Sequence, residues 1–421
     1  MGRCNGLTKT YDTRKLSFYV ISILLCLFLI QAHQAIANSP NIKLVEYGSI
    51  VIPGVAEKEN VTGLVYSKHL KWPQVSTTLS GKVTFHDVKN NTHSIVLDLK
   101  KHQQINFLTN NLKLGLYALA LHPNFSRPNE DGTGVFYTAH TENNTATNNS
   151  TNILGVESDK EVHHYDVISE WQVTNLEGTP SISESSREIL RVARYFENDY
   201  VVDLKFRSFD RSWDAEFGHL YIGFSGTNTQ ITEISLEQSH SSINGTILRI
   251  KPDKFGLKQY TIPENNPFTK SNQHLAEVYI WGLNNLQGFS WDMSGKKHLI
   301  LADSIDTNMQ EINIGERGAN FGSGLMRGNE LLEKGDLIKS NKIKRQLYLP
   351  ATSYSTNIGI QIVPGAVYRG NSVPQLVGFY IFADKKSDSL LYVPSRQLNH
   401  GKQARVSKLD VGDIEKLSIS T

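Results

Sequence analysis

Cysteine is almost absent from this chain of 421 residues, and its two positions are informative. Only Cys4 and Cys26 occur, and both lie within the first 37 residues. The rest of the chain can therefore have no disulfide, no cysteine-based zinc site and no thiol nucleophile. A large apolar core must stabilise it instead, and an apolar share of 39% is ordinary for a globular protein that buries such a core.

A strong charge bias is also missing. The chain has 43 basic and 41 acidic residues, a formal net charge of +2. The first 37 residues hold four of the basic and one of the acidic residues, so the remainder is close to neutral, with 39 against 40. A near-neutral body without basic stripes argues against nucleic acid as a partner.

Residues 1–37 have the layout of a secretory signal peptide. A basic region ends at Arg14-Lys15, the apolar run "LSFYVISILLCLFLI" follows, and the small-x-small pattern Ala35-Ile36-Ala37 closes the segment. The apolar run is shorter than the roughly 20 residues that a membrane span needs. We therefore expect an exported protein, periplasmic or secreted, with residues 38–421 as its folded part. An uncleaved N-terminal anchor is the alternative, and contact with a membrane is expected only in that case.

Helical periodicity is scarce after residue 40. Most segments are short alternating or apolar runs bounded by Gly, Pro, Asn or Asp, such as "GKVTFHDV", "HLYIGFSG" and "FYIFAD". This density of short strands predicts an all-β fold, and over about 380 residues it favours a β-propeller over a sandwich. The polar segment 141–159 is expected to be a mobile surface loop.

Three short motifs do not support a site. "GFSGT" (223–227) is one glycine short of a nucleophile elbow, and "GSGLMRG" (322–328) misses the dinucleotide-binding spacing by one residue. "HHYD" (163–166) offers two histidines, but neighbouring residues of a strand point to opposite faces. We therefore do not expect His163 and His164 to share a metal ion.

Longer motifs in a fixed order carry more information: "GLYALALHPNF" (115–125), "GTILRIKPD" (245–253), "EVYIWGLNNLQGFSWD" (277–292), "EINIGERGANFG" (311–322) and "PGAVYRGNSVPQLVGFYIFAD" (364–384). In this order they resemble the soluble quinoprotein glucose/sorbosone dehydrogenase family. The resemblance implies a six-bladed β-propeller of antiparallel four-stranded blades. It also implies oxidation of aldose sugars with pyrroloquinoline quinone (PQQ) and calcium.

The resemblance assigns cofactor contacts to four positions. The tip "GLNNLQG" carries Asn284 and Asn285 where the family has an Arg-Asn pair, so the fixed positive charge is lost. Arg369 matches a basic position that faces the cofactor. Lys113 lies near a polar contact. A late arginine pair of the family is absent.

The catalytic base of the family is a histidine, and here Asp199 falls at its position, in "ENDYVVDLKF". A histidine suits proton removal because its pKa lies near working pH, whereas a carboxylate needs burial to reach that range. A histidine from elsewhere, His122 or His219, at the centre of the propeller would favour catalysis. Plugging of the centre by Tyr200 and Val201 would oppose it.

Calcium is implied at "ADSIDTNMQE" (302–311), which is rich in oxygen ligands suited to a hard cation. The expected metal ligands are Asp303, Asp306 and Asn308, with Glu311 adjacent.

Two functions from different classes follow. One is an exported PQQ- and calcium-dependent sugar dehydrogenase with a divergent site. The other is a non-catalytic propeller, a pseudoenzyme, that binds a carbohydrate or protein partner, as the similar domain of animal Hedgehog-interacting proteins does. A carboxylate-based hydrolase is a distant third. Because the chain ends soon after its last motif, we also expect an N-terminal strand in "KLVEYGSIVI" to complete the final blade.

Overall fold

The computed structural model describes most of the chain between residues 60 and 409, together with two strand segments nearer the N-terminus, 29–32 and 42–45. Within 60–409 the description omits residues 67–73, 88–89, 91, 111–112, 146–152, 158, 184–185, 208–210, 227–241, 254–258, 273, 307, 333–346, 356–361 and 386–388. Nearly all of the predicted signal peptide therefore lies outside the described residues. No helix in the described part of the chain is long and apolar enough to cross a membrane.

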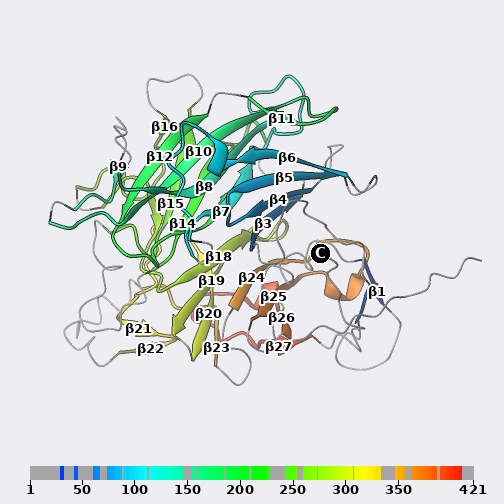
Figure 1. The fold of residues 1–421 in the computed structure, drawn as a ribbon. Coiled ribbons are helices and arrows are strands. Elements are labelled where there is room, and N and C mark those ends of the chain that lie inside the picture. The colour runs from blue at the N-terminus through cyan, green and yellow to red at the C-terminus, as the bar shows by residue number, and fades with distance from the viewer. Residues whose placement is uncertain are drawn as a thin grey trace, which may run out of the picture.

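The fold is an all-β propeller, as predicted, built from sheets that each use one continuous stretch of chain (Figure 1). The described residues form five blades, so the predicted count of six is not confirmed. Helical structure in this part of the chain is limited to three short 3-10 turns, η2 (Leu99–Lys101), η5 (Pro374–Leu376) and η6 (Ser395–Gln397).

The first two blades hold ten strands. Blade 1 contains β3 (Val61–Tyr66), β4 (Gln74–Thr78), β5 (Lys82–Asp87) and β6 (Thr92–Asp98). Blade 2 contains β7 (Leu116–Leu121), β8 (Val135–Asn143), β9 (Ile153–Leu154), β10 (His164–Thr174), β11 (Ser181–Ile182) and β12 (Arg187–Arg194).

The next three blades follow in chain order. Blade 3 contains β13 (Val201–Phe206), β14 (Leu220–Phe224), β15 (Ile247–Pro252), β16 (Tyr260–Thr261) and β17 (Val278–Ile280). Blade 4 contains β18 (Leu286–Trp291), β19 (Leu299–Asp306), β20 (Met309–Gly315) and β23 (Thr352–Ser355), with the small hairpin β21 (Met326–Arg327) and β22 (Glu330–Leu331) beside it. Blade 5 contains β24 (Ile362–Val367), β25 (Phe379–Asp384), β26 (Ser389–Pro394) and β27 (Ser407–Lys408).

Two sequence predictions about the chain's course were wrong. The segment 141–159, predicted as a loop, contributes the end of β8 and also β9, which pairs in parallel with β12. Strand β2 (Ile42–Val45), from the segment predicted to complete the last blade, pairs instead with β1 (Leu29–Ala32). The outer strand of blade 5 is β27, from the C-terminal part of the chain.

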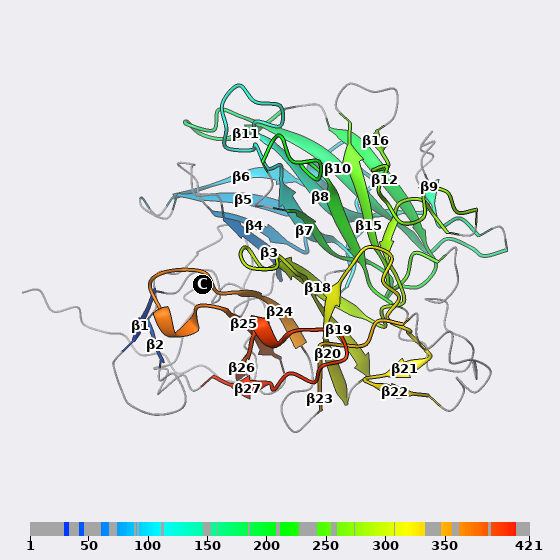
Figure 2. The same ribbon diagram turned by 180° about the vertical axis from the view of Figure 1, so that it is seen from behind.

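The core lies between the blades. Apolar clusters join blades 1 and 2, blades 2 and 3, blades 3 and 4, and blades 4 and 5. Because each sheet packs on both faces, a central strand can be apolar throughout, as in "LYIGF" of β14, the second strand of blade 3, where every residue is buried. Among the described residues no such cluster joins blade 5 to blade 1, and Figure 2 shows these two sheets on the same side of the ring.

A structural repeat that the sequence hides occurs at the start of every inner strand. In β3, β7, β13, β18 and β24, the register against the second strand shifts by a β-bulge. The residues within these shifts are Thr62, Tyr117, Val202, Gln287 and the pair Pro364-Gly365, and we call the five that are not glycine the bulge ring. A bulge turns a side chain away from the sheet's regular alternation. The bulge ring therefore places one side chain from each blade around the centre of the propeller.

Candidate functional site

A cavity of about 700 Å³ occupies the centre of the propeller, and residues from the inner strands of all five blades line it. All five members of the bulge ring contribute to its wall. The aromatic rings of Tyr117 and Tyr200 stack on one side, with centroids 4.8 Å apart and planes 18° apart. The wall is a mixture of apolar, hydroxyl and amide groups, with Asp203 and Lys205 as a hydrogen-bonded pair at 2.5 Å.

No histidine belongs to the described wall of this cavity. His122 instead lies against Phe206 and Phe217, and His219 contacts Glu216 through Nδ1 at 3.4 Å. Tyr200 and Val201 line the cavity but do not fill it. The centre of the propeller is thus open, and its polar character comes from hydroxyls, amides and a few charged groups.

Asp199, at the family's catalytic position, is only 2% exposed and does not line the cavity. Its backbone N–H donates to the carbonyl of Phe196 at 3.0 Å. Its Oδ2 accepts from Asn244 Nδ2 at 3.5 Å, and its backbone carbonyl accepts from His164 Nε2 at 3.0 Å. The side chain is therefore engaged inside the protein between blades 2 and 3.

A second carboxyl group, which sequence reasoning missed, lies in the same cluster. Asp166 of β10 is buried, and its Oδ2 is 3.2 Å from Nε of Arg194. Burial raises the pKa of Asp166 to about 7, the Arg194 charge opposes this shift, and the nearby Asp199 adds to it. Two buried carboxyl groups thus lie close enough to interact, and the guanidinium of Arg194 pairs with the carboxyl group of Asp166. The signal was present in the sequence as "HHYDV", but only the pairing of β10 with β12 brings Asp166 to Arg194.

The tip between β17 and β18 is folded around a buried carboxylate. The backbone N–H groups of Asn284 and Asn285 donate to Asp303 at 2.9 and 2.7 Å. The side-chain oxygen of Asn284 accepts from Ser323 Oγ at 3.0 Å, and the carbonyl of Asn285 accepts from Gln287 Nε2 at 2.9 Å. The tip is consequently a rigid turn whose polar groups are largely satisfied by its own chain.

The two predicted cationic contacts are likewise engaged. Arg369 donates from Nε and Nη2 to both oxygens of Asp292, at 2.8 and 2.5 Å, and so links blades 4 and 5. It borders the cavity, but its guanidinium is neutralised by this pair. Lys113 is exposed, and its Nζ donates to the side chain of Asn198.

The four oxygen-bearing residues of the predicted calcium segment separate into two pairs. Asp303 and Glu311 are buried and directly opposed on β19 and β20. Asp306 and Asn308 are exposed at the hairpin end, where Asp306 pairs with Arg327 at 3.0 Å and accepts from the Asn308 N–H at 2.6 Å. Among the described residues no three His, Cys, Asp or Glu side chains converge as a metal site.

The histidines of "HHYD" do converge, contrary to our expectation. Nδ1 of His163 lies 2.9 Å from Nδ1 of His164, with the two rings nearly perpendicular. The opposite-face rule applies within a strand, but β10 begins at His164 and His163 precedes it. Its backbone N–H donates to the carbonyl of Arg194 at 2.8 Å, and its ring lies against that of its neighbour.

The described residues suit the two groups that the resemblance implies, PQQ and calcium, to different degrees. PQQ carries three carboxylates and needs unneutralised cations, whereas Arg369 is paired with Asp292 and the expected arginine of the tip is Asn284. These two positions therefore do not fit PQQ. Calcium fits better, since Asp303 and Glu311 are buried oxygen donors and the side-chain oxygen of the neighbouring Asn313 makes no hydrogen bond.

Comparison with known proteins agrees with the fold. A sequence model of the Glucose / Sorbosone dehydrogenase family matches residues 205–414. The HIPL1 and HIPL2 proteins of Arabidopsis thaliana are 25% and 26% identical over 185 and 194 residues, which cover 40% and 41% of this chain. The matched region spans only 27% of each relative's own length.

Solved structures with the same fold include sugar dehydrogenases. PQQ-bound aldose sugar dehydrogenase from Streptomyces coelicolor has a TM-score of 0.54 at 15% identity, covering 90% of this chain and 84% of that one. Apo aldose sugar dehydrogenase from Escherichia coli has a TM-score of 0.57 at 16% identity, covering 83% and 85%. At such identities these structures support the fold alone. The chain therefore shares the propeller fold of these sugar dehydrogenases, and its residues 205–414 match the model of the glucose/sorbosone dehydrogenase family.

Proposed function

We propose that this protein is a sugar-binding propeller that has kept the dehydrogenase scaffold without its PQQ chemistry. One observation supports the proposal most directly. The side chains at the expected catalytic and cofactor positions already bond to other residues of the protein. Asp199 is buried, accepts from Asn244 and interacts with Asp166, and Arg369 is held by Asp292. A cofactor with three carboxylates would have to break these contacts and would find little uncompensated positive charge.

The bulge ring is the proposed sugar site. It combines an aromatic face, hydroxyls and an amide, namely Tyr117, Thr62 and Gln287, around an open cavity. Sugars present C–H faces that pack on aromatic rings and hydroxyls that exchange hydrogen bonds with amides. A neutral ligand also matches a wall in which Asp203 and Lys205 already neutralise each other.

Calorimetry tests this proposal. The purified protein is titrated with mono- and oligosaccharides, and the leading ligand is repeated with Gln287→Ala and with Gln172→Ala, an exposed glutamine outside the cavity. We expect Gln287→Ala to weaken binding about tenfold or more, through loss of a buried hydrogen bond, and Gln172→Ala to bind normally. Equal affinities of the two variants for the sugar would show that it binds outside the bulge ring.

A second candidate, a PQQ- and calcium-dependent sugar dehydrogenase with Asp199 as base, is favoured by the family match and by the retained Asn285. Titration with PQQ in excess calcium separates the two. Binding near one PQQ per chain, with dye reduction by an aldose, would support the dehydrogenase and overturn our proposal.

Export through residues 1–37 is part of the proposal and has its own test. Expression of the full chain in a secreting host should give a product whose N-terminus is Asn38. A retained leader would instead favour the membrane-anchored alternative.

A further inference from the structure

The side chains that line the central cavity are unevenly divided among the blades. Blades 3 and 4 supply most of the polar side chains of the wall, and we call this set the polar half: Tyr200, Asp203, Lys205, Gln287 and Ser290. Blades 1 and 5 supply a run of apolar side chains, which we call the apolar half: Val61, Leu64, Val65, Ile362, Val363, Pro364, Ala366, Val367 and Ile381. Every inner strand is the edge strand of its sheet, so backbone groups surround the cavity evenly and do not cause this division.

The polar half has hydrogen-bonding groups that the described part of the chain leaves unused. Gln287 Nε2 donates to the carbonyl of Asn285 at 2.9 Å, but its Oε1 has no hydrogen-bond partner among the described residues. Tyr200 donates its backbone N–H to Ser225 Oγ at 3.0 Å, whereas its hydroxyl makes no hydrogen bond within the same residues. An amide oxygen and a phenol hydroxyl can both bond to sugar hydroxyls.

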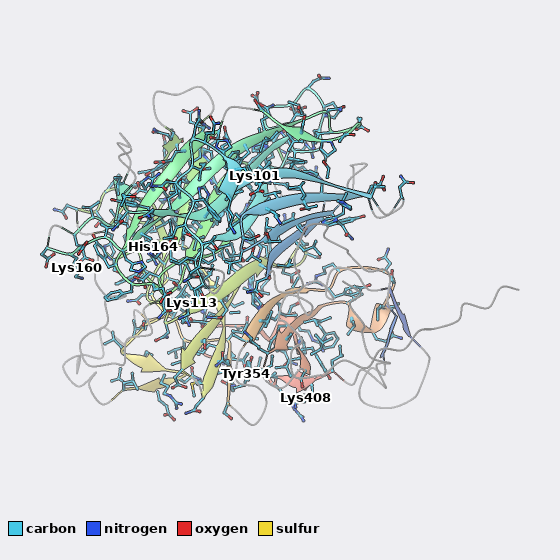
Figure 3. The ribbon with its side chains drawn as sticks, in the orientation of Figure 1. Lys101, Lys113, Lys160, His164, Tyr354 and Lys408 are labelled. Atoms are coloured by element: carbon cyan, nitrogen blue, oxygen red, sulfur yellow. The ribbon has the colours of Figure 1, made fainter. Side chains whose placement is uncertain are left out.

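Blade 2 supplies the aromatic ring beside this half. The hydroxyl of Tyr117 donates to the carbonyl of Lys113, and its ring stacks on that of Tyr200. Figure 3 shows Lys113 beside the green sheet of blade 2, well apart from Lys408 of blade 5. The stacked rings and the polar half therefore form one side of the cavity, away from blade 5.

The polar groups near the apolar half are engaged or lie at its ends. The hydroxyl of Thr62 bonds that of Thr77 at 2.9 Å, and the hydroxyl of Tyr368 accepts from the Val373 N–H at 3.0 Å. The two cations of blade 5 follow strand ends: Arg369 comes after β24, and Lys385 after the antiparallel β25. They therefore lie at opposite ends of the blade, with apolar wall between them.

Strand β3 shows that the protein does not fully cover this apolar surface. All of Val61–Val65 are only half-buried although β3 is an inner strand, whereas the inner strand β7 of blade 2 is mostly buried. Among the described residues no apolar cluster joins blade 5 to blade 1. Apolar surface at the cavity is thus left for a ligand to bury.

We propose that the ligand is amphiphilic: a glycoside whose sugar ring contacts the polar half and whose alkyl chain lies along β3 and β24. The inference rests on the proposed sugar site and adds the class of ligand that this site takes. A cavity of about 700 Å³ lies within the range of sites that hold drug-sized ligands, so it has room for both parts.

Calorimetry with methyl, butyl and hexyl β-glucosides, each below its micelle concentration, tests the inference on the purified protein. Each added methylene should tighten binding about fourfold until the apolar half is filled. Gln287→Ala should weaken binding of all three glucosides by a similar factor, because the lost amide contacts the sugar. Hexanol, which lacks the sugar, should bind far more weakly than hexyl glucoside.

A variant of the apolar half separates the chain from the sugar. Leu64→Asn should lower the gain in affinity from methyl to hexyl glucoside about tenfold, because an amide replaces an apolar side chain of the wall. The matched control is Ile95→Asn, an exposed residue of β6 outside the cavity, and it should keep the parental gain. Circular dichroism of both variants checks that they are folded.

The failures of the two proposals are distinguishable. If methyl and hexyl glucoside bind equally well, or if a simple sugar binds and the alkyl glucosides do not, the chain has no place in the cavity and only the amphiphilic ligand is wrong. An unchanged gain in Leu64→Asn has the same meaning. If no sugar and no glucoside binds, or if hexanol binds as tightly as hexyl glucoside, the sugar site itself is wrong and this inference falls with it.

Discussion

Asp303 and Glu311 lie directly opposite each other on β19 and β20, and both carboxyl groups are buried. Asp303 accepts from the N–H groups of the tip, and Glu311 accepts from the Gly328 N–H at 2.9 Å and from Asn313 Nδ2 at 3.3 Å. The ion pairs found among the described residues include neither carboxyl group. Burial raises the pKa of Glu311 to about 8 and that of Asp303 to about 6, with Asp303 adding to the shift of Glu311.

The first prediction concerns pH. A carboxyl group whose pKa is higher in the folded than in the unfolded chain favours folding at low pH. The free energy of unfolding should therefore fall as the pH rises from about 4.5, the ordinary value for Glu311, through about 8. Glu311→Gln cannot ionise, so its urea midpoint should depend less on pH and exceed that of the parent at pH 8. Glu330→Gln, an exposed residue of β22, should behave as the parent does. A parallel pH slope in Glu311→Gln would contradict the prediction.

Calcium should act on the same pair. If Asp303 and Glu311 hold the cation, added Ca²⁺ favours their ionised forms, and the melting temperature at pH 8 should rise with calcium concentration. Glu311→Gln should lose most of that rise, because one charged ligand is gone. A rise of the same size in both proteins would place calcium elsewhere.

The strands of the fold could be predicted from the sequence because alternation and turn residues are local signals. "GKVTFHDV", for example, contains β5, and "FYIFAD" is β25. The partners of the site residues could not be predicted in the same way. Asp292 and Arg369 are 77 residues apart, and Asp203 reaches the Phe289 N–H across 86 residues. The His163–His164 contact was missed for a different reason, since it depends on where a strand begins, which sequence patterns locate poorly.

The close approach of Gly226 to the tip gives the third prediction. A Cβ atom added to Gly226 would lie 1.5 Å from the backbone carbonyl oxygen of Asn284. Gly226→Ala should therefore displace the tip and lower the free energy of unfolding by on the order of 4 kcal/mol. The control is Gly218→Ala, where no atom lies within 4 Å and only the left-handed φ of +75° opposes the change. That variant should lose about 1 kcal/mol. Similar losses of unfolding free energy in the two variants, measured by urea unfolding, would show that the tip can shift at little energetic cost.

The link between blades 4 and 5 gives the fourth prediction. Arg369→Ala leaves Asp292, which is 6% exposed, without its bidentate partner. An unsatisfied buried carboxylate costs about 2 kcal/mol, and we expect that loss in urea unfolding. Asp292→Ala combined with Arg369→Ala should recover part of it, because no charge is then left unpaired. Sugar binding by Arg369→Ala should change little, since the proposed site uses the bulge ring. A variant of parental stability that no longer binds sugar would instead assign Arg369 to the ligand, and the pair with Asp292 would then be a resting contact that the ligand replaces.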